Sequence, residues 1–215
     1  MEPRTEPLSG RRAQAARNDQ RILEAARAVF LADPGAPVSA VAAEADVGMS
    51  ALYRRYPSKE ELLRRLSGDG LRRYILEAEA ALADDSDPWA AFVGFVRRVV
   101  DADTHSLTLR LAGTFTPTEE LQRDAATALD LNQRLLERTK AAGVVRADLD
   151  VNDLTFIFEQ VAAIRLGDQD RTSQLRHRYL ALLLDGLRTP APGLLPGPPP
   201  TWQEISRRWD RPTNP

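Results

Sequence analysis

The sequence contains no cysteine among its 215 residues. Disulfides, thiolate metal sites and cysteine nucleophiles are therefore excluded, and the absence fits a reducing compartment. The amino terminus has no apolar run that resembles a signal peptide, and no later stretch approaches the ~18 apolar residues needed to cross a membrane. We therefore expect a soluble, cytoplasmic protein without a membrane partner.

Strand signals are also nearly absent. No segment alternates apolar and polar residues between hairpin turns, whereas apolar residues recur at three- and four-residue spacing almost everywhere. Hydrophobic residues make up 43% of the chain and charged residues 28%, which is ordinary globular composition. The sequence therefore predicts an all-α fold.

The net charge of −2 lacks the basic balance that phosphate binding usually requires. The distribution matters more than the sum, because basic residues concentrate near the amino terminus. They are Arg11, Arg12, Arg17, Arg21, Arg54, Arg55 and Lys59. One end of the chain is thus locally basic.

The amino-terminal part is expected to hold three helices. Residues 1–16 are interpreted as a flexible basic arm, and the first helix begins near Asn18 or Asp19 and stops before Pro34. Two short helices follow, and Ser58 then caps a long helix, with Glu61 at the capping-box position. This predicts a first domain over residues 17–63.

The larger part, residues 64–188, is expected to be helical throughout. Asp87-Pro88 and the segment 116–119 are helix starts, the second of them for a helix that ends at Gly143. Helices near 152–166 and 172–188 each carry more apolar surface than one small core needs. The proline-rich tail, 189–215, excludes a helix over 190–200, but 202–209 can form a short one that folds back with both tryptophans as anchors.

Residues 38–56 have the pattern of a helix-turn-helix. Val38, Val41, Ala42 and Ala45 give the first helix an inward face, and its small side chains allow a close crossing. Asp46 lies at the sharp turn, where Asp tolerates the left-handed conformation better than most residues. Leu52 points inward on the second helix, which leaves Met49, Ser50, Tyr53 and Arg54 on its outer face.

The order of residues here resembles the TetR family of bacterial regulators. The resemblance rests on Ile22-Leu23-x-Ala25-Ala26-x-x-x-Phe30, on Val41-Ala42-x-x-Ala45-x-Val47 and above all on the segment from Leu52 to Leu62, LYRRYPSKEEL. It covers roughly residues 17–63. Three positions depart from the family pattern, since Asp46, Gly48 and Pro37 stand where glycine, serine and threonine are usual, so individual phosphate contacts cannot be transferred.

The resemblance implies a ligand-responsive transcriptional regulator, in its usual form a repressor. It would bind a near-palindromic operator in double-stranded DNA as a homodimer, dimerise through its last two helices and release the operator when a small-molecule effector binds. The candidate DNA contacts are Ser39, Gly48, Met49, Ser50, Tyr53, Arg54, Arg55 and Lys59. Tyr53 and Arg55 are expected to reach phosphates.

The effector site is less readable than the DNA-binding head. The candidate pocket residues are Phe92, Phe115, Asn132, Phe158 and Glu159, all of which can equally serve packing or internal hydrogen bonds. His105 and His177 lack metal-ligand spacing and are interpreted as ordinary surface or helix residues, so neither metal nor cofactor is expected. A helical enzyme, or an adaptor that keeps the helix-turn-helix only as a fold element, is the alternative, but no catalytic constellation supports an enzyme.

Overall fold

A computed structural model describes residues 8–191 and 193–209, except the side chains of residues 8–12, 108 and 109. Within these residues every regular element is a helix, and an isolated antiparallel bridge pairs Val145 with Arg188. The chain divides into two compact units, Met1–Leu66 and Ser67–Pro215. The prediction of an all-α fold is confirmed.

The first unit contains α1 (Leu8–Ala32), α2 (Val38–Glu44), α3 (Met49–Arg55) and the start of α4 (Lys59–Ala83). Its core holds the predicted inward positions of α1 to α3, among them Ile22, Ala26, Phe30, Val41 and Leu52. Ser58 caps α4 as predicted, since the backbone N–H of Glu61 donates to its Oγ at 3.1 Å.

The predicted start of the first helix near residue 18 is wrong. α1 begins at Leu8, so residues 8–16, expected to be part of a flexible arm, are helical, while residues 1–7 lie outside the described residues. Ala13, Ala15 and Ala16 favour a helix. Side-chain hydrogen bonds from Gln14 to Asn18 and from Arg17 to Gln14 add support at helical spacing.

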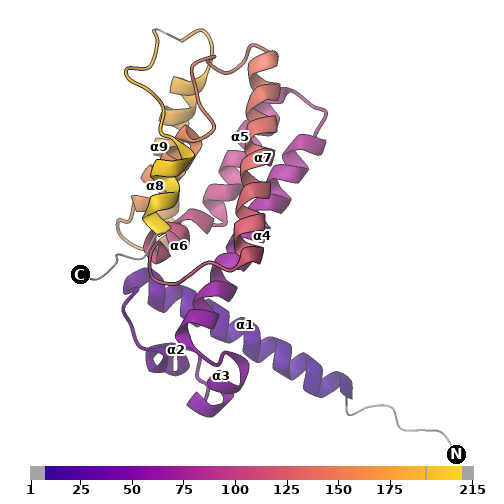
Figure 1. Ribbon diagram of the computed structural model, residues 1–215, viewed down its shortest axis with the longest axis vertical. Helices are drawn as coiled ribbons and strands as arrows, with labels where there is room; N and C mark the ends of the chain where they lie inside the picture. The colour runs from indigo at the N-terminus through magenta and orange to yellow at the C-terminus, as the bar shows by residue number, and fades with distance from the viewer. Residues whose placement is uncertain (1–7, 192, 210–215) are drawn as a thin grey trace, which may run out of the picture. The chain divides into compact units, whose positions relative to one another are not determined.

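The second unit is built around α5 (Pro88–Asp101), which contacts α6 (Thr104–Leu111), α7 (Glu119–Ala141), α8 (Asp153–Ala163) and α9 (Gln169–Leu187). Figure 1 shows α8 and α9 side by side, and they are in contact. Asp87 and Thr118 cap α5 and α7 as predicted. The core unites Tyr74 of α4, Phe95 of α5, Leu135 of α7, Phe158 of α8 and Leu184 of α9.

Three sequence predictions for this unit need correction. α6 was not expected, because its short segment lacks the Asp-Pro start that marks α5. α8 ends at Ala163, and Leu166 beyond it is exposed. The apolar stripe of α7 is shifted, because leucines at several spacings offered two registers and contact with α5 selects one of them. The observed buried positions are Leu121, Ala128, Leu131, Leu135, Leu136 and Thr139.

The carboxy-terminal segment folds back onto the second unit. α10 (Trp202–Ser206) and the 3-10 turn η1 (Arg207–Trp209) follow the proline-rich stretch, and Ile205 is buried. Trp209 meets Phe115 edge to face at 5.8 Å, as expected for an anchor. Trp202 remains exposed, so its predicted anchoring role is wrong; Arg208 instead forms the second attachment, through an ion pair with Glu159 at 2.7 Å.

Candidate functional site

The turn between α2 and α3 has the left-handed residue that the sequence indicated. Asp46 has φ of +50°, and the backbone N–H of Val47 bonds back to the carbonyl of Ala42 at 3.0 Å. Gly48 then precedes α3 as its N-cap. The turn therefore sets the crossing of the two helices without the glycine usual at this position.

Arg21 of α1 fastens this turn from outside the motif. Its Nη2 donates to the carbonyl of Ala45 at 2.6 Å and lies 3.4 Å from a carboxylate oxygen of Asp46. Sequence reasoning missed this role, because the partners are 24 and 25 residues apart and no local pattern links them. Arg21 is a positioning residue for α3.

The outer face of α3 is exposed as predicted. Leu52 is fully buried, whereas Met49, Ser50, Tyr53 and Arg54 are exposed on the same short helix. Ser39, in the first turn of α2, is exposed as well. The unit thus presents a thioether, two hydroxyls from α3 and a guanidinium on one helix, a set that can contact both base edges and phosphates.

Arg55 is not an unengaged cation. Its guanidinium binds both carboxylate oxygens of Asp19, with Nε at 2.6 Å and Nη2 at 2.9 Å, and the Tyr56 hydroxyl donates to the same carboxylate at 2.7 Å. These bonds, that of Arg55 first, hold the pKa of Asp19 below its usual value, and burial together with Asp19 raises the pKa of Tyr56. The triad ties the end of α3 to α1.

Lys59 is likewise engaged inside the unit. Its ammonium donates to the carbonyls of Pro34 and Ala36 at 2.9 and 2.8 Å and lies 5.0 Å from the centre of the Phe30 ring. An ammonium has three N–H groups, so at most one remains for a phosphate. Arg55 and Lys59, expected as the best phosphate contacts, therefore also hold the fold together.

The five candidate effector residues fall into three groups. Asn132 accepts a hydrogen bond from the Tyr74 hydroxyl at 2.8 Å, and Phe158 lies beside the same tyrosine, with ring centres 6.0 Å apart. Phe115 and Glu159 contact the carboxy-terminal segment instead, through Trp209 and Arg208. Phe92 is fully buried against Trp89.

His105 joins the interior aromatic cluster, contrary to its interpretation as an ordinary surface or helix residue. Its ring stacks on Phe158 at 4.7 Å and tilts against Tyr74 at 5.5 Å. Burial lowers the pKa of His105 to about 4, and the nearby Asp103 opposes this only in part. The imidazole is neutral near pH 7, as an apolar stack requires.

A small cavity adjoins this cluster where α5, α6, α8 and α9 meet. Its walls include Val99, His105, Phe158, Val161 and the guanidinium of Arg176, and its volume is about 10 Å³. That space holds roughly one water molecule. The cavity is therefore closed to a drug-sized molecule unless its walls move.

Two family models match the chain. That described as bacterial regulatory proteins of the tetR family matches residues 22–66, and that of an SbtR-like transcriptional regulator's C-terminal domain matches residues 87–189. None of the helices in the described part of the chain is both long and apolar enough to cross a bilayer.

Relatives of known structure share the fold over most of the chain. A TetR regulatory protein from Mycobacterium vanbaalenii is 30% identical, with a TM-score of 0.56 over 83% of this chain and 99% of its own. The regulator SCO0520 from Streptomyces coelicolor is 26% identical, with a TM-score of 0.55 over 80% and 99%.

The repressor LfrR is a further relative. In Mycolicibacterium smegmatis this HTH-type transcriptional repressor is 35% identical over 87 residues, which are 40% of this chain and 43% of the repressor. The match thus spans less than half of the repressor. The structure of LfrR from Mycobacterium smegmatis in complex with proflavine has a TM-score of 0.55 at 20% identity, over 77% of this chain and 95% of its own, a likeness of fold.

Proposed function

The chain belongs to the TetR family of bacterial transcriptional regulators, and on that basis we propose that it is a homodimeric repressor which a small-molecule effector releases from a near-palindromic operator. The family and the relatives above regulate transcription and are not enzymes. In a bacterial cell such a repressor acts in the cytoplasm, where the DNA is.

The observation that carries the proposal is the division of α3 into a buried and an exposed face. Leu52 fixes the helix to the unit, while Met49, Tyr53 and Arg54 extend outward from a turn held by Arg21. A major groove admits one α-helix, whose exposed side chains then reach base edges and phosphates. We assign Met49 and Ser50 to base contacts, and Ser39, Tyr53 and Arg54 to the phosphate backbone, with Gly48 allowing close approach.

Exposed apolar side chains support the homodimer. Phe156 on α8, and Tyr179 and Leu182 on α9, remain exposed in the single chain, as does Leu166 between these helices. Large exposed apolar residues on two adjacent helices are typical of an interface. Isologous contact between two copies would bury them and place two reading helices for two half-sites.

Support for an effector comes from the interior of the second unit. The aromatic cluster of Tyr74, Phe95, His105 and Phe158 holds polar groups of low charge at the centre of an apolar core. This mixture of aromatic walls and few polar atoms is typical of small-molecule sites. LfrR, with its bound proflavine, is an example of a ligand-binding protein with this fold.

A mobility-shift assay with the DNA upstream of the chain's own gene tests the proposal. Tyr53→Ala and Arg54→Ala should each weaken binding without loss of folding, because neither side chain is buried. Arg97→Ala, an equally exposed arginine on α5, is the matched control and should bind as the wild type does. Binding that is unaffected by either substitution on α3 would contradict the proposal.

A further inference from the structure

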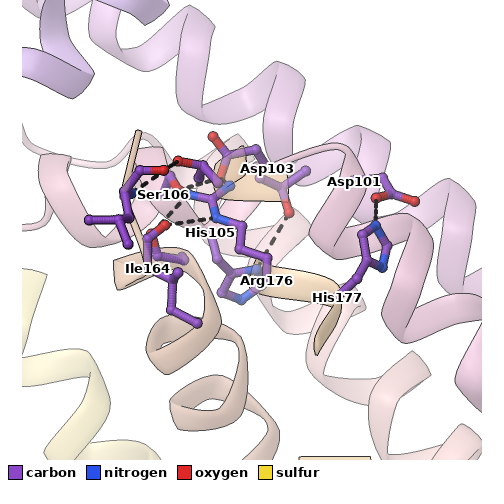
Figure 2. Close-up of polar contacts among 11 residues, drawn as sticks. Asp101, Asp103, His105, Ser106, Ile164, Arg176 and His177 are labelled. Carbon is purple, nitrogen blue, oxygen red and sulfur yellow. Dashed lines mark hydrogen bonds and ion pairs between the residues drawn. The ribbon is translucent and has the colours of Figure 1, made fainter. Parts of the chain in front are cut away.

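Arg176 of α9 links three helices inside the second unit. Its Nε donates to the carbonyl of Ile164 at 3.2 Å, and its Nη2 donates to the carbonyl of Ala162 at 2.9 Å, both at the end of α8. Its Nη1 donates to Asp103 at 2.8 Å, at the start of α6. Figure 2 shows these contacts around the central guanidinium.

The ion pair with Asp103 balances a charge that is otherwise costly. The Arg176 side chain is only 10% exposed, whereas that of Asp103 is 24% exposed. A buried guanidinium needs an anionic partner, because removal of that partner leaves an uncompensated charge. The neighbouring His105 contributes no charge, since burial lowers its pKa to about 4.

Asp103 is placed so that another anion can replace it. It precedes α6 with φ of +50°, and its carboxylate also accepts a hydrogen bond from the Ser106 hydroxyl. Asp103 and Arg176 both line the small cavity, whose remaining walls include Val99, Phe158 and Val161. The cavity thus has an apolar body with one ion pair at its edge.

We propose, on the basis of the function inferred above, that the effector is a small organic carboxylate, apolar elsewhere, which replaces Asp103 on the guanidinium of Arg176. Its apolar part packs on Phe158 in the place of His105. The exchange keeps one anion on Arg176, and Asp103 turns toward water. It also removes the bond that ties the start of α6 to α9.

Other ligand classes fit this site less well. A cation would face the guanidinium directly, and a neutral molecule that displaced Asp103 would leave Arg176 without an anion. A carboxylate has the two-oxygen geometry that an arginine binds best. The chemistry of the cavity therefore favours an acid over the matching amide or amine.

The test is calorimetric titration of the full chain with cinnamate and octanoate, each compared with its primary amide. The acids should bind about tenfold tighter than the amides, the effect of one charge-assisted contact. Asp103→Asn should tighten binding of the acids about tenfold further, because the ligand no longer competes with a resident carboxylate. Asparagine tolerates the left-handed conformation at this position.

Asp101→Asn is the matched control. Asp101 lies two residues before Asp103 but pairs with His177 at 2.7 Å, away from the cavity, as Figure 2 shows. It makes the same change in net charge, so it should leave the affinity for the acids unchanged. His105→Ala gives a second arm and should also tighten acid binding, because the ligand then displaces no imidazole.

Three results would overturn the proposal: equal affinity for acid and amide, no binding of either, or the same change in Asp101→Asn as in Asp103→Asn. Operator affinity, measured separately, distinguishes this failure from failure of the proposed function. If an uncharged compound releases the operator while the acids do not bind, the repressor function stands and the carboxylate site fails. If the acids bind in the expected pattern but the chain binds no DNA, the reverse holds.

Discussion

The Asp19 carboxylate receives both the guanidinium of Arg55, at 2.6 and 2.9 Å, and the hydroxyl of Tyr56, at 2.7 Å. One acidic side chain of α1 therefore fixes the last residue of the reading helix and the residue that follows it. Tyr56 is buried, so its hydroxyl depends on this acceptor. The stability of the head and its surface for DNA are linked through Asp19.

This relationship predicts a pH dependence. The pKa of Asp19 lies below its ordinary value of 3.8, chiefly because of the bond from Arg55. Its stabilising contribution is complete above that ordinary value and is lost as the pH falls through the lowered pKa. The difference in free energy of unfolding between wild type and Asp19→Asn, measured by urea denaturation, should be constant above pH about 5 and shrink below pH about 4. A difference that stays constant down to the lowest pH would refute this role.

The turn at Asp46 predicts a stabilising substitution. At φ of +50° a side chain is strained, and glycine removes that strain. Asp46→Gly should raise the free energy of unfolding by about 0.5–1 kcal/mol, since the 3.4 Å pair with Arg21 that it loses is solvent-exposed. Asp46→Ala is the control and should lower stability, because it keeps Cβ but loses the pair. Equal stability of the two variants would contradict the strain argument.

The salt dependence of DNA binding separates Arg54 from Arg55. Arg54 is exposed on α3, so Arg54→Ala should reduce the slope of log affinity against log salt by about 0.9 and leave the melting temperature unchanged. Arg55→Ala should instead lower the melting temperature as well, because it breaks the pair with Asp19. Titrations at several salt concentrations, with thermal melts of the same samples, measure both effects. A melting temperature unchanged by Arg55→Ala would count against the structural role of this residue.

The proposed interface predicts a change of oligomeric state. Leu182 on α9 is 61% exposed, and Leu76 on α4 is 60% exposed, so they form a matched pair. Leu182→Glu should convert the dimer to a folded monomer, because two buried carboxylates would face the partner copy. Leu76→Glu should leave the dimer intact. Light scattering after size exclusion measures both, and a Leu182→Glu dimer as stable as the wild type would place the interface elsewhere.

Local signals were predictable from the sequence. Ser58, Asp87 and Thr118 each cap a helix because their side-chain oxygens accept a backbone N–H three residues later, a pattern that adjacent residues specify. Asp46 was predictable for the same reason, since its conformation depends on its own side chain and the turn around it. The exposed face of α3 followed from the inward position of Leu52.

Contacts between distant segments were not predictable. Arg21 and Ala45 are 24 residues apart, Arg55 and Asp19 are 36 apart, and Arg176 and Asp103 are 73 apart. Each pair depends on how whole helices pack, which helical periodicity does not specify. For this reason Arg55 and Lys59 were expected to face DNA alone, and His105 was not expected in the aromatic core.

The most direct test of the proposed operator recognition is selection of DNA from a random pool by the purified full-length chain. The account predicts enrichment of a near-palindromic sequence with two half-sites about one helical turn apart, lost in a chain carrying Tyr53→Ala and Arg54→Ala. Enrichment of a single half-site, or of no sequence at all, would contradict the proposal that this chain is a dimeric, operator-binding repressor.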